Sequence, residues 1–220
     1  MPFGERREAL RSRNAIGIKR QVCANSEDST GARIGIFFGL EITPMGSDFA
    51  QLSPDVQPLG TARDFADEFI VALKKQQAMQ HFSRPELTLL AEYMDCFGVG
   101  RKSTVIHEGD DGDFLAILVT GAAQIVKLHE GHETVVRELK PGELFGEMSM
   151  IDGQRRFASC ITSEPSDFAV LTHQKLNDML ADHPRLGNKF LLMLLGLSAA
   201  RLRQALHVDE PQRCAVIACI

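Results

Sequence analysis

The chain has 220 residues, 44% of them hydrophobic, and a formal net charge of −5 at pH 7. This length can bury one sizeable core plus an accessory segment, and the acidic balance argues against a dedicated nucleic-acid surface, which usually carries a basic excess. The five cysteines are odd in number and scattered, no secretory signal precedes them, and no apolar run reaches the ~18 residues that a spanning helix needs. We therefore expect a cytoplasmic protein with reduced thiols and no membrane association.

The first 60 residues differ in composition from the rest of the chain. A basic arm at 6–20 is followed by a polar stretch at 25–31, and only 34–42 has the pattern of a possible strand. The basic arm could contact an acidic partner or nucleic acid, but its composition favours a solvated tail. We expect residues 1–60 to be a flexible segment ahead of a folded domain at 61–210.

Helices are expected between residues 61 and 96. Apolar residues recur at helical spacing from position 62 to 73, and Thr61 followed by Asp64 is typical of a helix N-terminus. A second helix is expected after Ser83, because Pro85 is favoured in the first turn and apolar residues on one face follow it.

Between residues 97 and 172 the apolar period changes to two, which indicates strands. The expected strands are 104–107, 114–119, 123–128, 134–139, 158–162 and 168–172. Glycine-containing turns separate them, and strands this short at regular spacing argue for an antiparallel barrel or jelly roll. The predicted fold class is mainly β with flanking helices.

The predicted barrel is followed by two more helices and a tail at 209–220. Thr172 can cap a helix over 173–181, and a longer helix begins at Arg185 and ends near Val208. The leucines of this longer helix leave apolar surface on more than one side. One side would pack on the barrel, and another could pair with a second copy or cover a ligand. The chain then ends without the residues that a helix-turn-helix needs, so we expect no direct DNA binding.

A single helical turn interrupts the strands, within the run 141–158. Glu147 stands ahead of this turn, Gly153 breaks it, and Arg156 follows. A helix opening after Gly146 presents unpaired backbone amides and the positive end of its dipole, which suits a phosphate. Arg156 can meet that phosphate with a planar fork of donors, while Glu147 accepts a hydrogen bond from a sugar hydroxyl. The run therefore predicts a pocket for a ribose joined to a phosphate.

The same run resembles the phosphate-binding cassette of the cyclic-nucleotide-binding domain, which occurs in protein kinase A regulatory subunits, cyclic-nucleotide-gated channels and the bacterial catabolite activator protein. That cassette reads Phe-Gly-Glu-Leu-small-Leu, then a short loop and Arg-small-Ala, and the resemblance extends from about Phe82 to Leu206. It implies a double-stranded β-helix (jelly roll), a ribose 2′-hydroxyl contact for Glu147 and a cyclic phosphate contact for Arg156. Counting backbone amides, the implied ligand-binding residues are Gly146, Glu147, Met148, Ser149, Arg156, Phe157 and Ala158.

Phe157 departs from the family pattern, where a small residue or a hydroxyl follows the arginine. Its ring could crowd the pocket or stack on the purine. Phe157 supplies no hydroxyl to read guanine, and Ala205 and Leu206 occupy the expected capping turn of the last helix. Apolar cover suits adenine, so the sequence favours cAMP.

The functional hypothesis is a regulatory sensor that binds a cyclic nucleotide in an eight-stranded jelly roll and signals to an unknown effector protein through its last helix. We also expect a homodimer through 185–208. No cofactor, metal site or catalysis is expected, because His129 and His132 lack a third ligand at useful spacing and no nucleophile–base pair is evident. The alternative is a ligand-free structural or interaction module, in which Glu147 and Arg156 pair across an empty, degenerate pocket.

Overall fold

The structure is a computed structural model that describes residues 56–129 and 131–206. All of them belong to one of the two compact units of the chain, Met45–Ile220. The expectations for the basic arm, for a strand at 34–42 and for the tail at 209–220 lie outside the described residues. No helix within the described ranges is long and apolar enough to cross a membrane.

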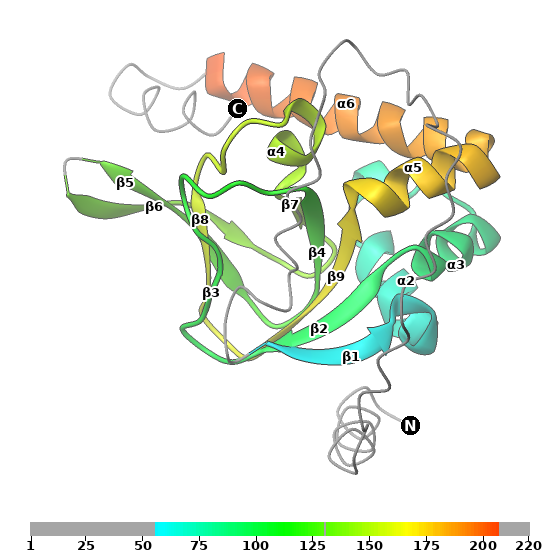
Figure 1. Cartoon of the computed structure of the whole chain (residues 1–220), viewed down its shortest axis with the longest axis horizontal. Helices are drawn as coiled ribbons and strands as arrows, with labels where there is room; N and C mark the ends of the chain where they lie inside the picture. Colours follow the sequence, from blue (N-terminus) through cyan, green and yellow to red (C-terminus); the bar gives the residue numbers. More distant parts are fainter. Residues whose placement is uncertain (1–55, 130, 207–220) are drawn as a thin grey trace, which may run out of the picture. The chain divides into compact units, whose positions relative to one another are not determined.

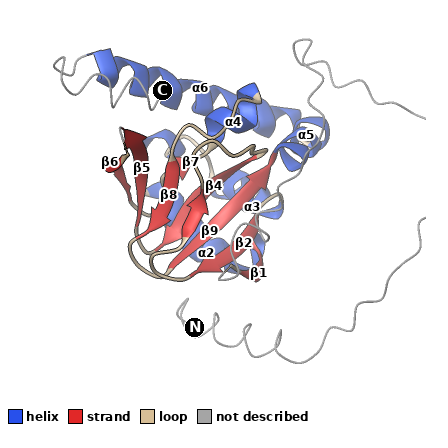
Figure 2. Ribbon diagram, turned by 60° about the vertical axis from the view of Figure 1, so that its left-hand side comes forward, coloured by secondary structure: helices blue, strands red, loops and turns tan. Residues whose placement is uncertain are grey.

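Nine strands form two antiparallel sheets in the described part of the chain (Figures 1 and 2). The first sheet has the order β1-β2-β9-β4-β7 and the second has the order β3-β8-β5-β6. The strands are β1 (Gln57–Thr61), β2 (Asp95–Val99), β3 (Thr104–Ile106), β4 (Phe114–Thr120), β5 (Ala123–His129), β6 (His132–Leu139), β7 (Leu144–Phe145), β8 (Ser159–Thr162) and β9 (Ser166–Thr172). The arrangement is the predicted jelly roll with flanking helices.

The sequence pattern of each strand matches its place in the sheets. β4 lies between β9 and β7, and its residues 114–119 are all buried and all apolar, as expected of a strand covered on both faces. β6 is an edge strand whose residues 132–135 are exposed, and most of its side chains are polar or charged. A core between the sheets is filled from both, and Phe145 and Phe168 meet edge to face at 5.7 Å.

The helices begin where the caps predict. The 3-10 helix η2 (Ala62–Phe65) and α2 (Ala66–Lys74) follow a capping box formed by Thr61 and Asp64. After η3 (Gln77–Met79), α3 (Arg84–Glu92) follows a second box, in which the Ser83 amide donates to Glu86 at 2.7 Å. The hydroxyl of Thr172 caps α5 (His173–Asp182) by accepting from the Lys175 amide at 3.2 Å.

The long helix α6 (Pro184–Leu206) covers one end of the two sheets and passes over the short helix α4 (Glu147–Asp152) (Figures 1 and 2). On this helix, Phe190 and Leu194 are buried against the rest of the domain. Near its start, Lys189 donates to both carboxylate oxygens of Glu86 on α3 at 2.8 Å. Leu192, Leu195 and Leu202 are exposed, so α6 does present a second apolar side.

The structure contains three strands, β1, β2 and β7, that the sequence did not predict. β1 lies within the segment expected to be flexible, and it pairs with β2 so that Leu59 is only 2% exposed. β2 begins at Asp95, where a helical region was expected to continue to 96, and β7 has only two residues. The region from Asp95 to Thr172 holds eight strands, β2 to β9, as expected of the jelly roll, and β1 adds a ninth strand to the described residues.

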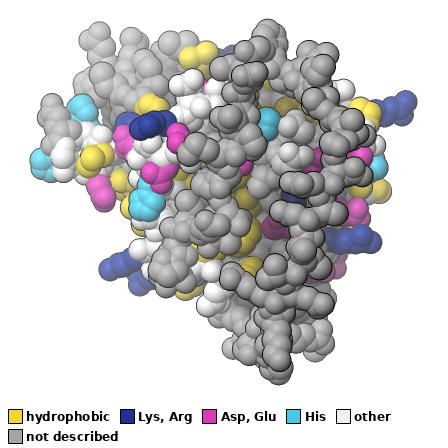
Figure 3. All heavy atoms as spheres, viewed as in Figure 1, with side chains coloured by type: hydrophobic (Ala, Val, Ile, Leu, Met, Phe, Trp, Pro, Cys, Tyr) yellow, Lys and Arg dark blue, Asp and Glu magenta, His cyan; other side chains and the backbone are white. Residues whose placement is uncertain are grey.

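Figure 3 shows the surface of one face of the molecule. On its described part, basic, acidic and histidine side chains are interspersed.

Candidate functional site

Two glycines delimit the helical turn that the sequence analysis singled out. Gly146 precedes α4 with φ of 78° and Gly153 follows it with φ of 67°, both in the left-handed region that favours glycine. The first residue of the helix, Glu147, is 2% exposed, and Ser149 is also buried. The turn therefore carries a carboxylate into the interior between β7 and β8.

Arg156 is held at the edge of this turn by its backbone and its side chain. Its amide donates to the Asp110 carbonyl at 2.7 Å, and its carbonyl accepts from the Gly109 amide at 2.7 Å. The side chain is 4% exposed, with Nη1 donating to the Gly146 carbonyl at 2.7 Å and the guanidinium carbon 4.2 Å from the centre of the Phe114 ring. These contacts place the guanidinium beside the start of α4.

Two glycines leave the space that this guanidinium fills. A Cβ at Gly112 would lie 1.9 Å from Nε of Arg156, and a Cβ at Gly146 would lie 2.8 Å from its Nη1. Any larger residue at either position would have to displace the arginine side chain. The loop at 112 and the turn at 146 thus act as a two-sided cradle for Arg156.

Arg156 remains a cation at neutral pH although its surroundings disfavour the charge. Burial lowers the pKa of Arg156 to about 10, and the nearby carboxylates of Asp113 and Asp110 partly offset this effect. Its Nη2 atom is buried and has no hydrogen-bond partner among the described residues. A buried donor without an acceptor is unfavourable, so an anion beside Arg156 would supply the hydrogen-bond acceptor that Nη2 lacks.

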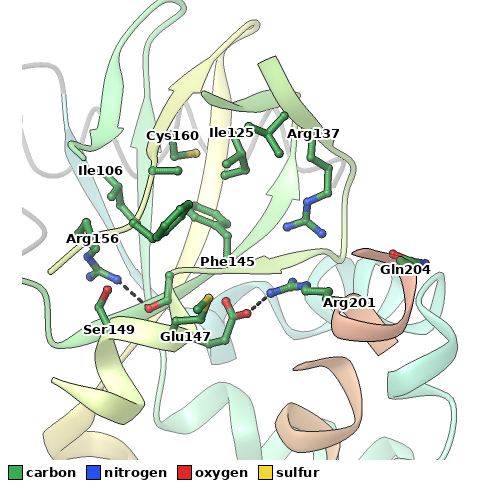
Figure 4. A pocket seen from close by; sticks show the side chains of 15 residues that line it. Ile106, Ile125, Arg137, Phe145, Glu147, Ser149, Arg156, Cys160, Arg201 and Gln204 are labelled. Carbon is green, nitrogen blue, oxygen red and sulfur yellow. Dashed lines mark hydrogen bonds and ion pairs between the residues drawn. The ribbon is translucent and has the colours of Figure 1, made fainter. Parts of the chain in front are cut away.

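Glu147 has a partner, and that partner is not Arg156. Nη1 of Arg201, from α6, donates to Oε1 of Glu147, and Nη2 of Arg201 donates to the Leu144 carbonyl at 2.9 Å (Figure 4). The expected pairing of Glu147 with Arg156 in the degenerate-pocket alternative is therefore wrong. Arg201 was missed in the sequence, because no spacing rule connects a residue of the last helix to a turn 54 positions earlier.

A cavity of about 320 Å³ opens between these groups. All seven residues that the sequence analysis assigned to ligand binding line it: Gly146, Glu147, Met148, Ser149, Arg156, Phe157 and Ala158. The structure adds eight others: Ile106, Ile125, Val136, Arg137, Phe145, Cys160, Arg201 and Gln204. Burial raises the pKa of the Cys160 thiol, so this residue is a neutral part of the wall.

The cavity has two ends with an apolar stretch between them (Figure 4). We call the side formed by Gly146 and Arg156 the Arg156 end. We call the side formed by Arg137, Arg201 and Gln204 the Arg137 end. Ile125, Phe145 and Cys160 lie between the two in the view of Figure 4, so the cavity offers cations at both ends of an apolar wall.

Phe157 lines the cavity and is contacted by a lysine, Lys127. Nζ of Lys127 lies 3.9 Å from the centre of the Phe157 ring and donates to the Phe157 carbonyl at 2.6 Å. The same ammonium donates to Oε1 of Glu108 at 2.6 Å. Neighbouring Arg155 is exposed, with Asp111 at 3.8 Å, so of the two adjacent arginines only Arg156 lines the cavity.

Comparisons with known proteins agree with this geometry. A family model described as "Cyclic nucleotide-binding domain" matches residues 99–183. A crystal structure of a cyclic nucleotide-binding domain from Methylobacillus flagellatus is 39% identical with a TM-score of 0.63, covering 69% of this chain and 85% of that one.

Two curated relatives extend the comparison. A global nitrogen regulator of Synechocystis is 30% identical over 112 residues, covering 50% of this chain and 48% of that protein. A cyclic AMP receptor protein of Thermus thermophilus is 31% identical over 102 residues, covering 46% and 45% respectively. The chain therefore spans about half the length of these curated relatives.

Proposed function

This chain belongs to the cyclic nucleotide-binding domain family, and from that premise we propose that its cavity binds a cyclic nucleotide. The observation that carries the proposal is Arg156, a buried guanidinium in the cavity wall with an unsatisfied Nη2. A cyclic phosphate is a compact anion with several acceptor oxygens, so it can provide the guanidinium with both a counter-charge and an acceptor for Nη2. The amides of Met148 and Ser149, at the same end, would add donors to it.

In this arrangement the ribose lies against Glu147. A carboxylate has about four acceptor sites on its two oxygens, so Glu147 can hold Arg201 and still accept a hydrogen bond from the 2′-hydroxyl. The proposal therefore gives Glu147 a sugar contact and Arg156 the phosphate contact. The remaining volume, toward the Arg137 end, receives the base.

Calorimetric titration of cAMP and cGMP into the purified chain tests the proposal, with 5′-AMP and 5′-GMP as controls that carry a more highly charged, open phosphate. Saturable binding of a cyclic form, tighter than its open counterpart, is the expected result. A ligand at a hundred times its dissociation constant adds about 2.7 kcal/mol to stability, so melting should rise by roughly 5–10 °C. No binding of any cyclic nucleotide would instead favour the ligand-free interaction module.

We propose further that the chain is a regulatory sensor without catalytic activity, and that α6 carries its signal. The contact that supports this proposal is the one between Arg201 and Glu147, because it ties a residue of α6 to the proposed ribose-binding group. A ligand that favours one position of α6 shifts the population toward it and alters the surface offered to an effector protein. Hydrogen exchange of residues 198–206 should change on binding, and unchanged exchange there would reject this route.

A homodimer through 185–208 is the remaining part of the proposal. It is supported by Leu192 and Leu195, which are 69% and 66% exposed on one side of α6. Leu194 is unsuited to the test because it is buried within the protomer. Replacing Leu192 and Leu195 with glutamate should give a monomer by light scattering, whereas Val71→Glu, which changes an exposed apolar residue of α2, should not. A wild-type monomer at high concentration would reject the dimer.

The sequence favoured adenine because Phe157 and the end of α6 offer no hydroxyl for guanine. We therefore propose cAMP as the ligand, and the titration of cAMP and cGMP described above tests this choice of base.

A further inference from the structure

Phe157 places an aromatic ring where the family pattern has a small residue or a hydroxyl. It directly follows Arg156 and lines the cavity. Rotation about the single bonds of its side chain could carry a free ring into the volume that a phosphate at Arg156 needs. The contacts that hold the ring therefore decide whether the Arg156 end is open to a ligand.

A single ammonium group contacts both the ring and the carbonyl of Phe157. Nζ of Lys127, on β5, lies 3.9 Å from the centre of the ring and donates to the Phe157 carbonyl at 2.6 Å. The face of the ring attracts the cation, and the hydrogen bond ties that cation to the main chain of the same residue. Together the two contacts fix the orientation of the ring relative to the main chain.

Glu108, in the loop between β3 and β4, holds this ammonium in place. Its Oε1 accepts from Lys127 at 2.6 Å, and its Oε2 accepts from the Leu128 amide at 3.0 Å. Burial raises the pKa of Glu108, but the hydrogen bonds from Leu128 and Lys127 outweigh this effect and hold the pKa below its ordinary value. The carboxylate is therefore charged at neutral pH, and it pairs with a lysine whose side chain is only 22% exposed.

The same loop also holds the main chain on both sides of Phe157. The Gly109 amide donates to the Arg156 carbonyl at 2.7 Å, and the Glu108 amide donates to Oγ of Ser159 at 3.0 Å. Phe157 thus lies between two anchored residues, and Lys127 adds the orientation of its side chain. Lys127 is not among the described residues that line the cavity, so its effect on a ligand passes through the groups that it holds.

We propose that Lys127 is a positioning residue of the Arg156 end, which holds the ring of Phe157 against the cavity wall and keeps the phosphate volume open. This role rests on the proposed function, because it concerns the fit of a cyclic nucleotide with its phosphate at Arg156. The held ring neither crowds the pocket nor stacks on the purine. If the ring is released, only the molecules whose ring is on the wall can bind, and the apparent affinity falls by that fraction.

The test is a double-mutant cycle, measured by calorimetric titration of cAMP and cGMP into the wild-type chain, Lys127→Met, Phe157→Ala and the double variant. Lys127→Met should weaken binding by about 3- to 30-fold, the range for a partly desolvated cation–π contact. Phe157→Ala should bind within about threefold of wild type, because the held ring does not contact the ligand. In the Phe157→Ala background, Lys127→Met should cost less than about twofold, because no ring remains to be held.

Two further variants separate the ring contact from charge and from general stability. Lys127→Arg keeps a cation that can lie over an aromatic face, and it should retain affinity within about threefold of wild type. Lys175→Met removes a partly buried lysine of α5 that also donates to a carboxylate at 2.6 Å, that of Asp95. Lys175 is not among the described residues of the cavity wall, so this change should leave affinity as it was.

Melting curves show whether each variant is folded. Lys127→Gln, which keeps a donor for the carbonyl but lacks the charge, replaces Lys127→Met if the methionine variant does not melt cooperatively.

The outcomes separate this role from the function on which it rests. If no cyclic nucleotide binds to wild type, the proposed function fails and the role of Lys127 fails with it. If wild type binds and Lys127→Met binds equally well, the function stands and the role is overturned. Equal losses from Lys127→Met with and without the ring would show that Lys127 acts through its charge or the main chain, which also overturns it. So does a loss in Phe157→Ala as large as that in Lys127→Met, because the ring would then support the ligand.

Discussion

The two ends of the cavity differ in what builds them. At the Arg156 end the guanidinium is 4% exposed, is enclosed by Gly112 of the β3–β4 loop and Gly146 at the start of α4, and contacts the ring of Phe114 on β4. At the Arg137 end, Arg137 is partly exposed, and Arg201 and Gln204 belong to α6. The first end is formed before any ligand arrives, whereas the second depends on the position of a helix. The proposal accordingly assigns common cyclic-phosphate recognition to the first end and selectivity and response to the second.

The largest effect is expected at the Arg156 end. Arg156→Leu should weaken binding of cAMP and cGMP alike, by roughly 30-fold or more, because losing one member of a buried charge-assisted contact costs about 2–5 kcal/mol. Arg155→Leu removes the same charge from the adjacent, exposed position and should leave affinity within about twofold. Calorimetry on both variants measures the difference, and equal losses would mean that overall charge, not the Arg156 contact, holds the ligand.

Gly112→Ala should produce the next largest loss without removing any charge. Its Cβ would stand 1.9 Å from Nε of Arg156, so the flexible guanidinium must move away from its place. The expected result is about 10- to 100-fold weaker binding, the range for a hydrogen bond to a charged group, with a melting temperature close to wild type. Gly100→Ala is the matched control, because its Cβ would meet only Ser103 Oγ, at 3.5 Å. Full affinity in Gly112→Ala would show that Arg156 need not occupy its present position.

At the other end, Arg201→Met should weaken binding by about tenfold, because Glu147 loses the partner that orients it. The loss should be smaller for 2′-deoxy cyclic nucleotides, which have no hydroxyl for Glu147 to bind, and this non-additivity distinguishes a role through Glu147 from a general weakening of α6. Arg203→Met, two positions along the same helix and exposed, is the control. Equal losses for ribose and deoxyribose ligands would contradict the assigned role.

The smallest effect is expected away from both ends, where Lys189 anchors the start of α6 to Glu86. Hydrogen bonds from Lys189, and then from Ser83, lower the pKa of Glu86 from 4.5 to about 2. The resulting stabilisation is present above about pH 4.5 and is lost as the pH falls toward 2, because protonation removes the charge that these donors favour. Glu86→Gln should therefore lower the melting temperature at pH 7 by at most about 4 °C, since a third of the side chain is exposed and screened.

The same difference in melting temperature should shrink as the pH is lowered from 4.5 toward 2, and cyclic nucleotide affinity at pH 7 should not change. Thermal melting across that pH range provides the measurement. A difference that persists at pH 2 would show that Glu86 acts through packing and not through its charge.

Local sequence patterns were sufficient to predict most helices and strands and the residues at the Arg156 end of the cavity. The capping residues Ser83 and Thr172 located two helices because a cap acts within three or four residues. The run from Gly146 to Ala158 located seven wall residues for a similar reason, since the α4 turn and Arg156 are close in sequence. β1 was missed because Pro58 and Gly60 disfavour a strand, and only its pairing with β2 buries Leu59.

The residues at the Arg137 end could not be predicted from local sequence patterns. Arg137 looks like an ordinary charge on an edge strand until the register places it opposite Ile125, which pairs on its other side with Cys160. Arg201 looks like a solvated residue near the end of an amphipathic helix until α6 is packed across the sheets. Both depend on which segments meet, and a single sequence with no strand register does not contain that information.

The glycine cradle has a consequence for how relatives of this chain are judged. A relative could keep the glutamate and the arginine of the motif and yet carry alanine where Gly112 stands, 44 positions upstream of Arg156 in the chain's numbering. Its motif would score as intact, while its arginine would have no room to take up the pose seen here. The residue that permits the site is thus invisible to a pattern written only over 145–158. Sorting family members into binders and non-binders should therefore include the size of the residue at this remote loop position.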